Sequence, residues 1–302
     1  MGGFRSVFCR ELGRFVEVPE VVGSVVSLTP SVTAVLLDLG LGDLIVGLSP
    51  WCGFLRLYGY SVPDAPVLGS YDGLVVDRLV GVGPDLVLLA GGYQAARLVS
   101  VLEGLGIPYF VTMLPRGIEL LEFPVELGYV LGVVGRGVGL MRESVRLLWE
   151  GRESVVREGV EGVRVAVVME IGGPVVPGLA SHVTQCLEAV GFDVVNKEVV
   201  EAPYVWGGEA DRVLGRLVEG CDVLLIQLAT PDPTCGRVEG VLGGKPPVPT
   251  VALPILYLSD YSPAFLRRLP ELAAAVARAC GRGGSFCECL ALKPRHRRGS
   301  GG

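Results

Sequence analysis

Aromatic side chains lie directly after hydrophobic runs in both halves of this 302-residue chain. The positions are Trp51, Tyr71 and Tyr93 in the first half, and Tyr204, Trp206, Tyr257 and Tyr261 in the second. Ligands of open parallel sheets bind beyond the carboxyl ends of the strands, so we expect the rings to converge on a gap between two halves. The alternative is that each ring only closes the end of a hydrophobic core. Because rings recur at equivalent loops and combine a large area with a polar tip, the pattern favours a binding cleft.

Polar residues that could do chemistry are few. One of the two histidines, His296, lies in the last ten residues, so the body of the chain cannot assemble a Ser-His-Asp triad or a multi-histidine metal site. His182 follows Ser181 at the start of a predicted helix, where it either ligates the metal of a bound compound or is a helix-start histidine held neutral by the helix dipole. Arg116 either meets an anionic group of the ligand or pairs with Glu119 on the surface. With no nucleophile elbow or dinucleotide fingerprint, the sequence predicts no catalytic residue, no cofactor and no metal site.

The eight cysteines do not form the framework of a small disulfide-rich domain, because they are spread over a long chain. The tight cluster is Cys280 with Cys287 and Cys289 in the segment FCEC. A C-x-C lacks the paired C-x-x-C spacing of a structural zinc site, so a local disulfide or free thiols is preferred to a metal. The sequence leaves the redox state of these three residues open.

The elements that must position these side chains are short Val- and Leu-rich strands alternating with helices, which is typical of parallel sheets covered on both faces. We expect strands at 25–29, 44–49, 65–69, 85–90 and 109–114 in the first half, and at 164–171, 192–198, 221–228 and 249–255 in the second. Helices are expected from Ser31 or Thr33 to Leu39, and over 94–104, 181–190, 209–219 and 264–279. The predicted fold class is therefore α/β.

Between the halves, residues 137–159 carry apolar side chains at helical spacing and predict an amphipathic helix that links two lobes, with Gly151 as a weak point. The expected organisation has five parts: an N-terminal extension over 1–22, an α/β lobe over 23–135, the linking helix over 136–160, a second α/β lobe over 161–281 and a basic flexible tail over 282–302.

Charge and hydropathy exclude several classes of function. The net charge is -6, and four basic residues lie in the last ten positions, so the remainder is still more acidic and argues against a nucleic-acid groove. No window has the roughly 18 uncharged apolar residues of a membrane span, and the first residues do not resemble a secretory signal. We therefore expect a cytoplasmic protein, or an extracytoplasmic one if translation starts further upstream.

Several blocks resemble a known family in sequence and order. VVSLTPSVTAVLLDLGLGDLIVGLSPWC and APVLGSYDGLVVDRLVGVGPDLVLLAGG are similar to the N-terminal lobe of the class III solute-binding proteins of ABC importers for cobalamin and ferric siderophores. EIGGPVVPGLASHVTQCLEAVGF resembles the strand, cleft loop and helix of that family's second lobe. LSDYSPAFLRRLPELAAAVA resembles its terminal helix, so the likeness extends over roughly residues 23–280.

The resemblance implies two Rossmann-like lobes with parallel sheets, joined by a rigid spine helix, with the ligand held between them. In the cobalamin branch, aromatic residues after these strands pack against the corrin. The matching positions in this sequence are Trp51, Tyr71 and either Tyr204 or Trp206. With the residues singled out above, the expected ligand-binding set is Trp51, Tyr71, Tyr93, Arg116, His182, Tyr204, Trp206 and Tyr257.

The expected function is non-enzymatic binding of a metal chelate, either cobalamin or a related corrinoid, or a ferric siderophore or haem. The protein would act as a monomer, as the binding component of an ABC importer or as an intracellular relative. The resemblance implies that Asp77 and Asp211 dock to arginines of the membrane permease. One alternative is a chelatase-like enzyme acting on a tetrapyrrole, with His182 and Glu170 exchanging protons. Another is an interaction module whose cleft takes a partner protein.

Overall fold

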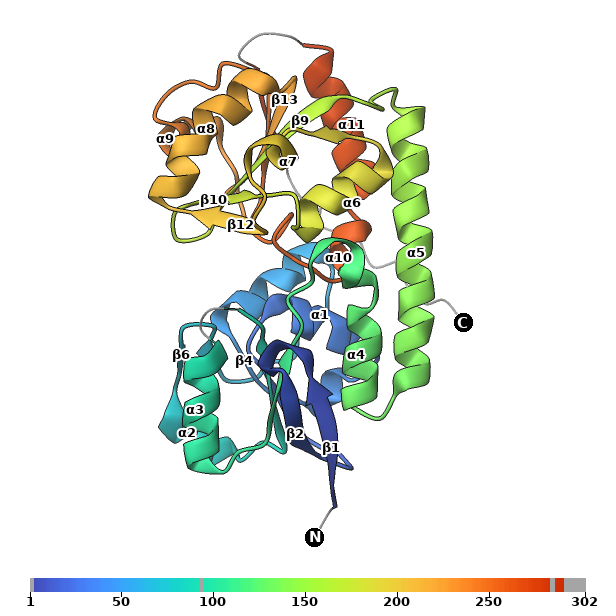
Figure 1. Ribbon diagram of the computed structural model, residues 1–302, viewed down its shortest axis with the longest axis vertical. Helices are drawn as coiled ribbons and strands as arrows, with labels where there is room; N and C mark the ends of the chain where they lie inside the picture. Colours follow the sequence, from blue (N-terminus) through green and yellow to red (C-terminus); the bar gives the residue numbers. More distant parts are fainter. Residues whose placement is uncertain (1–2, 93–94, 283–285, 291–302) are drawn as a thin grey trace.

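The computed structural model describes residues 3–92, 95–282 and 286–290 and has two lobes beside a long helix (Figure 1). The N-terminal lobe contains a four-stranded parallel sheet in the order β4 (Ile45–Leu48), β3 (Val25–Ser27), β7 (Leu86–Ala90) and β8 (Tyr109–Thr112). Its helices are α1 (Pro30–Asp38), α2 (Val76–Val82), α3 (Ala95–Leu105) and α4 (Phe123–Val130). The predicted α/β class with parallel sheets is confirmed.

Buried runs explain these strands. Leu86, Val87, Leu88 and Leu89 of β7 are all at most 1% exposed, although their side chains point alternately to the two faces of the sheet. A strand covered on both faces needs apolar residues at every position, and this gives the continuous hydrophobic run seen in the sequence.

The C-terminal lobe has a mixed sheet. Its order is β12 (Tyr204–Trp206), β10 (Pro174–Pro177), β9 (Arg164–Glu170), β13 (Val223–Gln227), β14 (Thr250–Leu253) and β15 (Cys287–Cys289), with β11 (Asp193–Val194) also pairing with β9. β9, β13, β14 and β15 are parallel, whereas β10 pairs antiparallel with both of its neighbours, β9 and β12. The helices are α6 (His182–Val190), α7 (Asn196–Val199), α8 (Gly208–Gly220), α9 (Cys235–Leu242), α10 (Pro263–Leu266) and α11 (Leu269–Cys280).

Two local features depart from the predicted pattern of this lobe. β9 turns back into β10 through Gly172 and Gly173, whose φ values of 66° and 147° favour glycine, and this places an antiparallel hairpin where a parallel crossover was expected. The strand expected over 192–198 is wrong after Val194, because α7 begins at Asn196. The Asn196 amide makes three 2.8 Å hydrogen bonds, two to the backbone of Val167 and one to a neighbouring carbonyl, so it continues the edge pairing in place of a strand.

Both chain ends take part in the fold further than the sequence indicated. Residues 4–19 form an antiparallel hairpin of β1 (Phe4–Cys9) and β2 (Arg14–Pro19). Its inner side chains are buried in the core of the N-terminal lobe, so this segment is part of that lobe and not an extension. At the other end β15 joins the sheet of the second lobe, and the remainder of the predicted basic tail, 291–302, lies outside the described residues.

The linking helix α5 (Val134–Arg157) has 24 residues, about 36 Å at 1.5 Å per residue, and it is continuous through Gly151. A Cβ atom at Gly151 would lie 2.9 Å from the Leu269 side chain of α11. The glycine is therefore needed for close packing of α11 against α5 and does not interrupt the helix.

A segment of the second lobe locks the two lobes together. Ile255, Leu256 and Tyr261 belong to the hydrophobic core of the N-terminal lobe. Arg267 at the end of α10 makes a 2.8 Å ion pair with Asp38 of α1. The lobes are thus joined by buried side chains as well as by α5.

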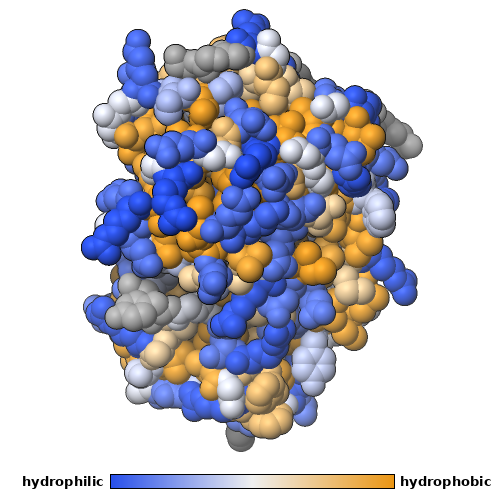
Figure 2. Space-filling model, turned by 45° about the horizontal axis from the view of Figure 1, so that its top comes forward, coloured by the Kyte–Doolittle hydropathy of each residue, from blue (hydrophilic) through white to orange (hydrophobic). Residues whose placement is uncertain are grey.

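The surface seen in Figure 2 intersperses hydrophilic side chains with smaller hydrophobic areas. In the part of the chain that the structure describes, no helix has both the length and the apolar character needed to cross a membrane.

Candidate functional site

An apolar cavity of about 690 Å³ lies between the lobes. The N-terminal lobe contributes Leu28, Thr29, Tyr71, Leu89, Ala90, Gly91, Gly92, Ala95, Leu98 and Leu114, and the C-terminal lobe contributes Pro203, Tyr204 and Trp206. Many of the first group come at or just beyond the carboxyl ends of β3, β7 and β8, where open parallel sheets bind ligands. The volume falls within the roughly 300–1,000 Å³ range of small-molecule sites.

Aromatic rings from both lobes line this cavity. Tyr71 follows Ser70 in a tight turn between β5 (Gly69–Ser70) and β6 (Gly73–Leu74), and its side chain is 46% exposed. Tyr204 and Trp206 lie on the edge strand β12, with ring centroids 6.2 Å apart and planes inclined by 53°. Trp206 is 54% exposed, so both lobes present ring surface that a ligand can cover.

A smaller cavity of about 130 Å³ shares Leu114, Tyr204 and Trp206 with the main one and extends to His182. Ser181 caps α6 by accepting a hydrogen bond from Thr184 N, and this places His182 at the first position of the helix, 1% exposed. Its Nε2 lies 3.1 Å from the Leu258 carbonyl oxygen. That oxygen can only accept, so Nε2 carries the proton.

Because Nε2 carries the proton, the other ring nitrogen of His182, Nδ1, can only accept a hydrogen bond. Nδ1 accepts from the Tyr204 hydroxyl at 2.9 Å. Burial lowers the pKa of His182 to about 4, so the ring is neutral. Both ring nitrogens of His182 are engaged in this arrangement, and its bond with Tyr204 orients that cavity residue. Direct contact of His182 with a ligand stays a prediction.

Two buried hydroxyls remain unpartnered beside the cavities. Thr29 Oγ1 and Tyr261 Oη lie close enough to interact with each other, but within the described chain neither makes a hydrogen bond of ordinary distance and angle. The two residues are only 8% and 7% exposed. Thr29 precedes α1 but its side chain does not cap the helix. Unpaired buried hydroxyls carry a desolvation cost, so both atoms are available to a polar group of a ligand.

Two further expected ligand contacts, Trp51 and Arg116, lie away from both cavities. Trp51 stacks on Phe54 at a centroid distance of 6.3 Å in a 3₁₀ segment after β4 and lines neither cavity. Arg116 is exposed and also lines neither cavity, while Glu119 accepts a hydrogen bond from the Arg116 backbone and pairs with Arg10. Tyr93 lies outside the described residues.

Tyr257 is also not part of the cleft, because its ring is completely buried in the core of the second lobe and its hydroxyl donates to the Arg268 carbonyl. Leu256 before it has a φ of 65°, an unusual value for a residue with a side chain, and this turn directs the chain inward. Arg268 holds the turn by donating to the carbonyls of Leu256 and Tyr257.

The pair required for the chelatase alternative is not assembled. Glu170 forms a 3.1 Å ion pair with Arg237 of α9 and accepts from Ala229 N at 2.9 Å. These partners outweigh the effect of burial and lower the pKa of Glu170. Glu170 is therefore held as an ion-paired carboxylate, while His182 is bonded to Tyr204 and Leu258.

Asp77 and Asp211, the expected docking residues, both lie exposed in the first turns of helices, α2 in one lobe and α8 in the other. A further cavity of about 720 Å³ also touches both lobes, but the two arginines on its wall are already ion-paired. There Arg267 pairs with Asp38 and Arg268 pairs with Asp260. The apolar, ring-lined cavity is accordingly the candidate binding site.

The sequence did not identify Thr29, Leu114 or the Gly91–Gly92 backbone as cavity residues. The available signal was position: each comes just beyond the end of a buried parallel strand. Small or apolar residues at such positions are too common to single out without the fold.

The fold matches those of solved binding proteins. The periplasmic heme-binding protein RhuT from Roseiflexus sp. RS-1 aligns over 86% of this chain and 99% of its own, with a TM-score of 0.67 and 18% identity. The periplasmic vitamin B12 binding protein BtuF of Vibrio cholerae aligns over 86% of this chain and 98% of its own, with a TM-score of 0.60 and 15% identity. At these identities the likeness establishes the two-lobed fold.

Sequence comparison adds a relative and a family. The vitamin B12-binding protein of Yersinia pestis (strain Pestoides F) is 35% identical over 86 residues, which are 28% of this chain and 29% of the relative. The chain thus matches less than a third of the length of this curated relative. The sequence profile described as "Periplasmic binding protein" matches residues 25–199, more than half of the chain. From this match and the two-lobed fold, the chain belongs to the periplasmic binding protein family.

Proposed function

We propose that this protein binds a large, flat metal chelate without transforming it: cobalamin or a related corrinoid, or haem or a ferric siderophore. The observation that carries the proposal is the apolar interlobe cavity walled by Tyr71 on one side and by Tyr204 and Trp206 on the other. The printed names of the relatives, which are vitamin B12- and heme-binding proteins, support this class of ligand.

Ring surface and cavity volume together provide enough binding free energy. Burying about 300 Å² of apolar surface, counted on the ligand and the wall together, is worth about 7 kcal/mol at 25 cal/mol per Å², before the cost of association. A flat macrocycle presents such an area in one piece, whereas a small anion or amino acid does not. The size and apolar character of the cavity therefore favour a tetrapyrrole or a similarly large chelate.

Polar groups at the wall would orient the ligand. The hydroxyls of Thr29 and Tyr261 are buried and unpartnered, and Thr29 lies at the N-terminus of α1, where the helix dipole favours negative charge. We expect a carboxylate, phosphate or amide oxygen of the chelate to approach this point. The rings would then cover the apolar faces of the ligand.

The bonding of the titratable groups supports a role without catalysis. His182 is buried, neutral and bonded at both nitrogens, and Glu170 is held by Arg237. Neither group is free to exchange a proton with a pyrrole nitrogen.

We further propose that the protein delivers its ligand to an ABC permease. Asp77 and Asp211 present exposed carboxylates on separate lobes, which suits docking to two basic patches of a partner. Substituting both by Asn in the full chain is expected to leave ligand affinity unchanged and to weaken binding to the reconstituted permease. Equal permease affinity before and after substitution would contradict this assignment.

The central experiment is titration of the full chain with hydroxocobalamin, hemin and a ferric siderophore, followed by absorbance and calorimetry. Stoichiometric binding of one of them, with a shifted visible spectrum, is the expected result. Metal insertion into a free porphyrin would support a chelatase instead. Absence of binding to all three would refute the proposed ligand class.

A further inference from the structure

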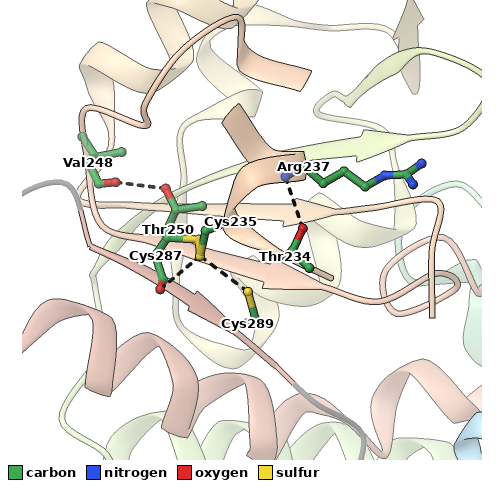
Figure 3. Close-up of a disulfide and its surroundings, with 7 residues drawn as sticks. All are labelled: Thr234, Cys235, Arg237, Val248, Thr250, Cys287 and Cys289. Carbon is green, nitrogen blue, oxygen red and sulfur yellow. Dashed lines mark hydrogen bonds between the residues drawn. A yellow bond between two sulfur atoms is a disulfide. The ribbon is translucent and has the colours of Figure 1, made fainter. Parts of the chain in front are cut away.

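Three cysteine sulfur atoms meet in the second lobe, away from the residues that line the interlobe cavity. Cys235 at the first position of α9 forms a disulfide with Cys287 of β15, and the Sγ atom of Cys289 lies 3.5 Å from that of Cys235 (Figure 3). Of the two alternatives expected for Cys280, Cys287 and Cys289, a local disulfide is wrong for Cys287, which pairs with a residue 52 positions earlier. Free thiols are found at Cys280 and Cys289.

The edge strand β15 explains why two of the sulfurs face the third. Successive side chains of a strand point to opposite faces, so a C-x-C segment in β15 places both thiols on one face. Glu288 between them points the other way and makes a 2.6 Å ion pair with Arg278 of α11. The parallel pairing of β15 with β14 then holds Cys287 and Cys289 in a fixed register against Cys235.

The three sulfurs form a triangle and not a line, because all lie within 4.8 Å of one another. Attack of Cys289 on the disulfide would need three sulfurs in line, with the outer two about 5.5 Å apart, given a bond of about 2.05 Å next to the 3.5 Å separation. Tetrahedral zinc with bonds of about 2.3 Å instead sets its sulfur ligands about 3.8 Å apart. The Cys235–Cys289 separation of 3.5 Å is already close to this spacing, while Cys235 and Cys287 reach it only after their disulfide is reduced. The arrangement is therefore not that of an in-line disulfide relay, and after reduction it suits a metal-thiolate site.

We propose that the reduced form of this cluster binds one thiophilic divalent cation of the Zn²⁺ type through the thiolates of Cys235, Cys287 and Cys289. The fourth coordination position is left to water or an external ligand. The disulfide closes the site when the protein is oxidised. This site is separate from the proposed chelate cavity, and its test does not depend on that function.

A dithiol reductant supplies the two electrons that open the Cys235–Cys287 disulfide. One thiolate of the reductant attacks the Cys235–Cys287 disulfide, its second thiol resolves the mixed disulfide, and two electrons and two protons pass to the cysteines as the reductant becomes a disulfide. Zn²⁺ then replaces the protons of three thiols, so three protons are released and the site carries one negative charge.

The experiment uses the full chain, reduced with a phosphine that does not compete for metal, and Co²⁺ as a spectroscopic probe. We expect one Co²⁺ per chain, thiolate-to-cobalt charge-transfer absorbance and displacement of Co²⁺ by Zn²⁺. The oxidised chain is expected to bind none. Cys289→Ser should weaken Co²⁺ binding at least about tenfold, since even outer-shell partners of a metal contribute this much. The matched control Cys280→Ser, which removes an exposed free thiol outside the triangle, should bind as the wild type does.

A second measurement covers the case in which Cys289→Ser does not fold. In the reduced wild type, Zn²⁺ should protect Cys235, Cys287 and Cys289 together from alkylation while Cys280 reacts, as read by peptide mass spectrometry. Reduced protein that binds no Co²⁺ or Zn²⁺, or full Co²⁺ binding by folded Cys289→Ser, would overturn the proposal.

Discussion

The three tryptophans of the chain provide a graded test of the binding cavity. Trp206 lines the cavity and is 54% exposed, whereas Trp51 does not line it and Trp149 lies exposed on α5. A tryptophan has about 200 Å² of surface to bury, so about 110 Å² of Trp206 is available to a ligand. At 25 cal/mol per Å² this is worth up to about 2.7 kcal/mol, or about a hundredfold in affinity.

A flat ligand covers one face of the ring, which halves this value, so Trp206→Ala is expected to weaken binding about tenfold. Calorimetric titration with whichever of hemin, hydroxocobalamin or a ferric siderophore binds the wild type measures the loss. Trp149→Ala, which removes a more exposed ring on the spine helix, is the matched control and should not change the affinity. If Trp206→Ala and Trp149→Ala bind equally well, or Trp51→Ala has the larger effect, the assignment of the cavity is wrong.

Three further predictions concern stability and pH. Gly151→Val should lower the free energy of unfolding by about 2 kcal/mol, because the new side chain overpacks against Leu269. Gly139→Ala lies on the same helix with no neighbour near its Cβ position and should raise the free energy of unfolding by up to about 1 kcal/mol. Chemical denaturation compares the two variants, and equal effects would contradict the packing role of Gly151. Burial raises the pKa of Glu126 from 4.5 to about 7, so the folded state holds the proton more tightly and the free energy of unfolding falls as pH rises from about 4.5 to 7. Glu126→Gln should therefore be about 1–2 kcal/mol more stable than the wild type at pH 8 and nearly equal to it at pH 4. A stability difference that does not change with pH would refute this. Burial lowers the pKa of His182 from 6.5 to about 4, so the stability contributed by the neutral ring is complete above pH 6.5 and is lost as pH falls toward 4. Between pH 6.5 and 4 the wild type should lose more stability than His182→Gln. Identical pH profiles of the two proteins would show that the ring is not buried and neutral.

The strands that could be predicted from the sequence are those buried on both faces. β7 and β13 are mostly apolar runs because all of their residues except Ala90 are buried, and the sequence places each strand correctly to within one or two residues at either end. The linking helix was predictable for the opposite reason, since one face packs and the other is solvated. In elements of this kind, the order of apolar and polar residues along the chain shows which faces are buried.

The rest depends on contacts that no local pattern records. Tyr204 and Tyr257 both follow predicted strands, yet one lines the cavity and the other is buried, because the left-handed turn at Leu256 sends the chain inward. β15 is three residues long and depends on pairing with β14, so its sequence alone resembles a loop. Cys235 was not grouped with Cys287 for the same reason: 52 residues separate them and only the sheet brings them together.

The insertion of Ile255, Leu256 and Tyr261 into the core of the N-terminal lobe limits how far the lobes can move when a ligand binds. Swinging the two halves apart would extract three apolar side chains into water, at about 1.5–3 kcal/mol for each large one. We therefore expect the ligand-bound and ligand-free protein to have nearly the same arrangement of the two lobes. If the protein delivers its ligand to a permease as proposed, the permease would have to recognise the cavity rim and the ligand itself, and release would require work to separate the lobes.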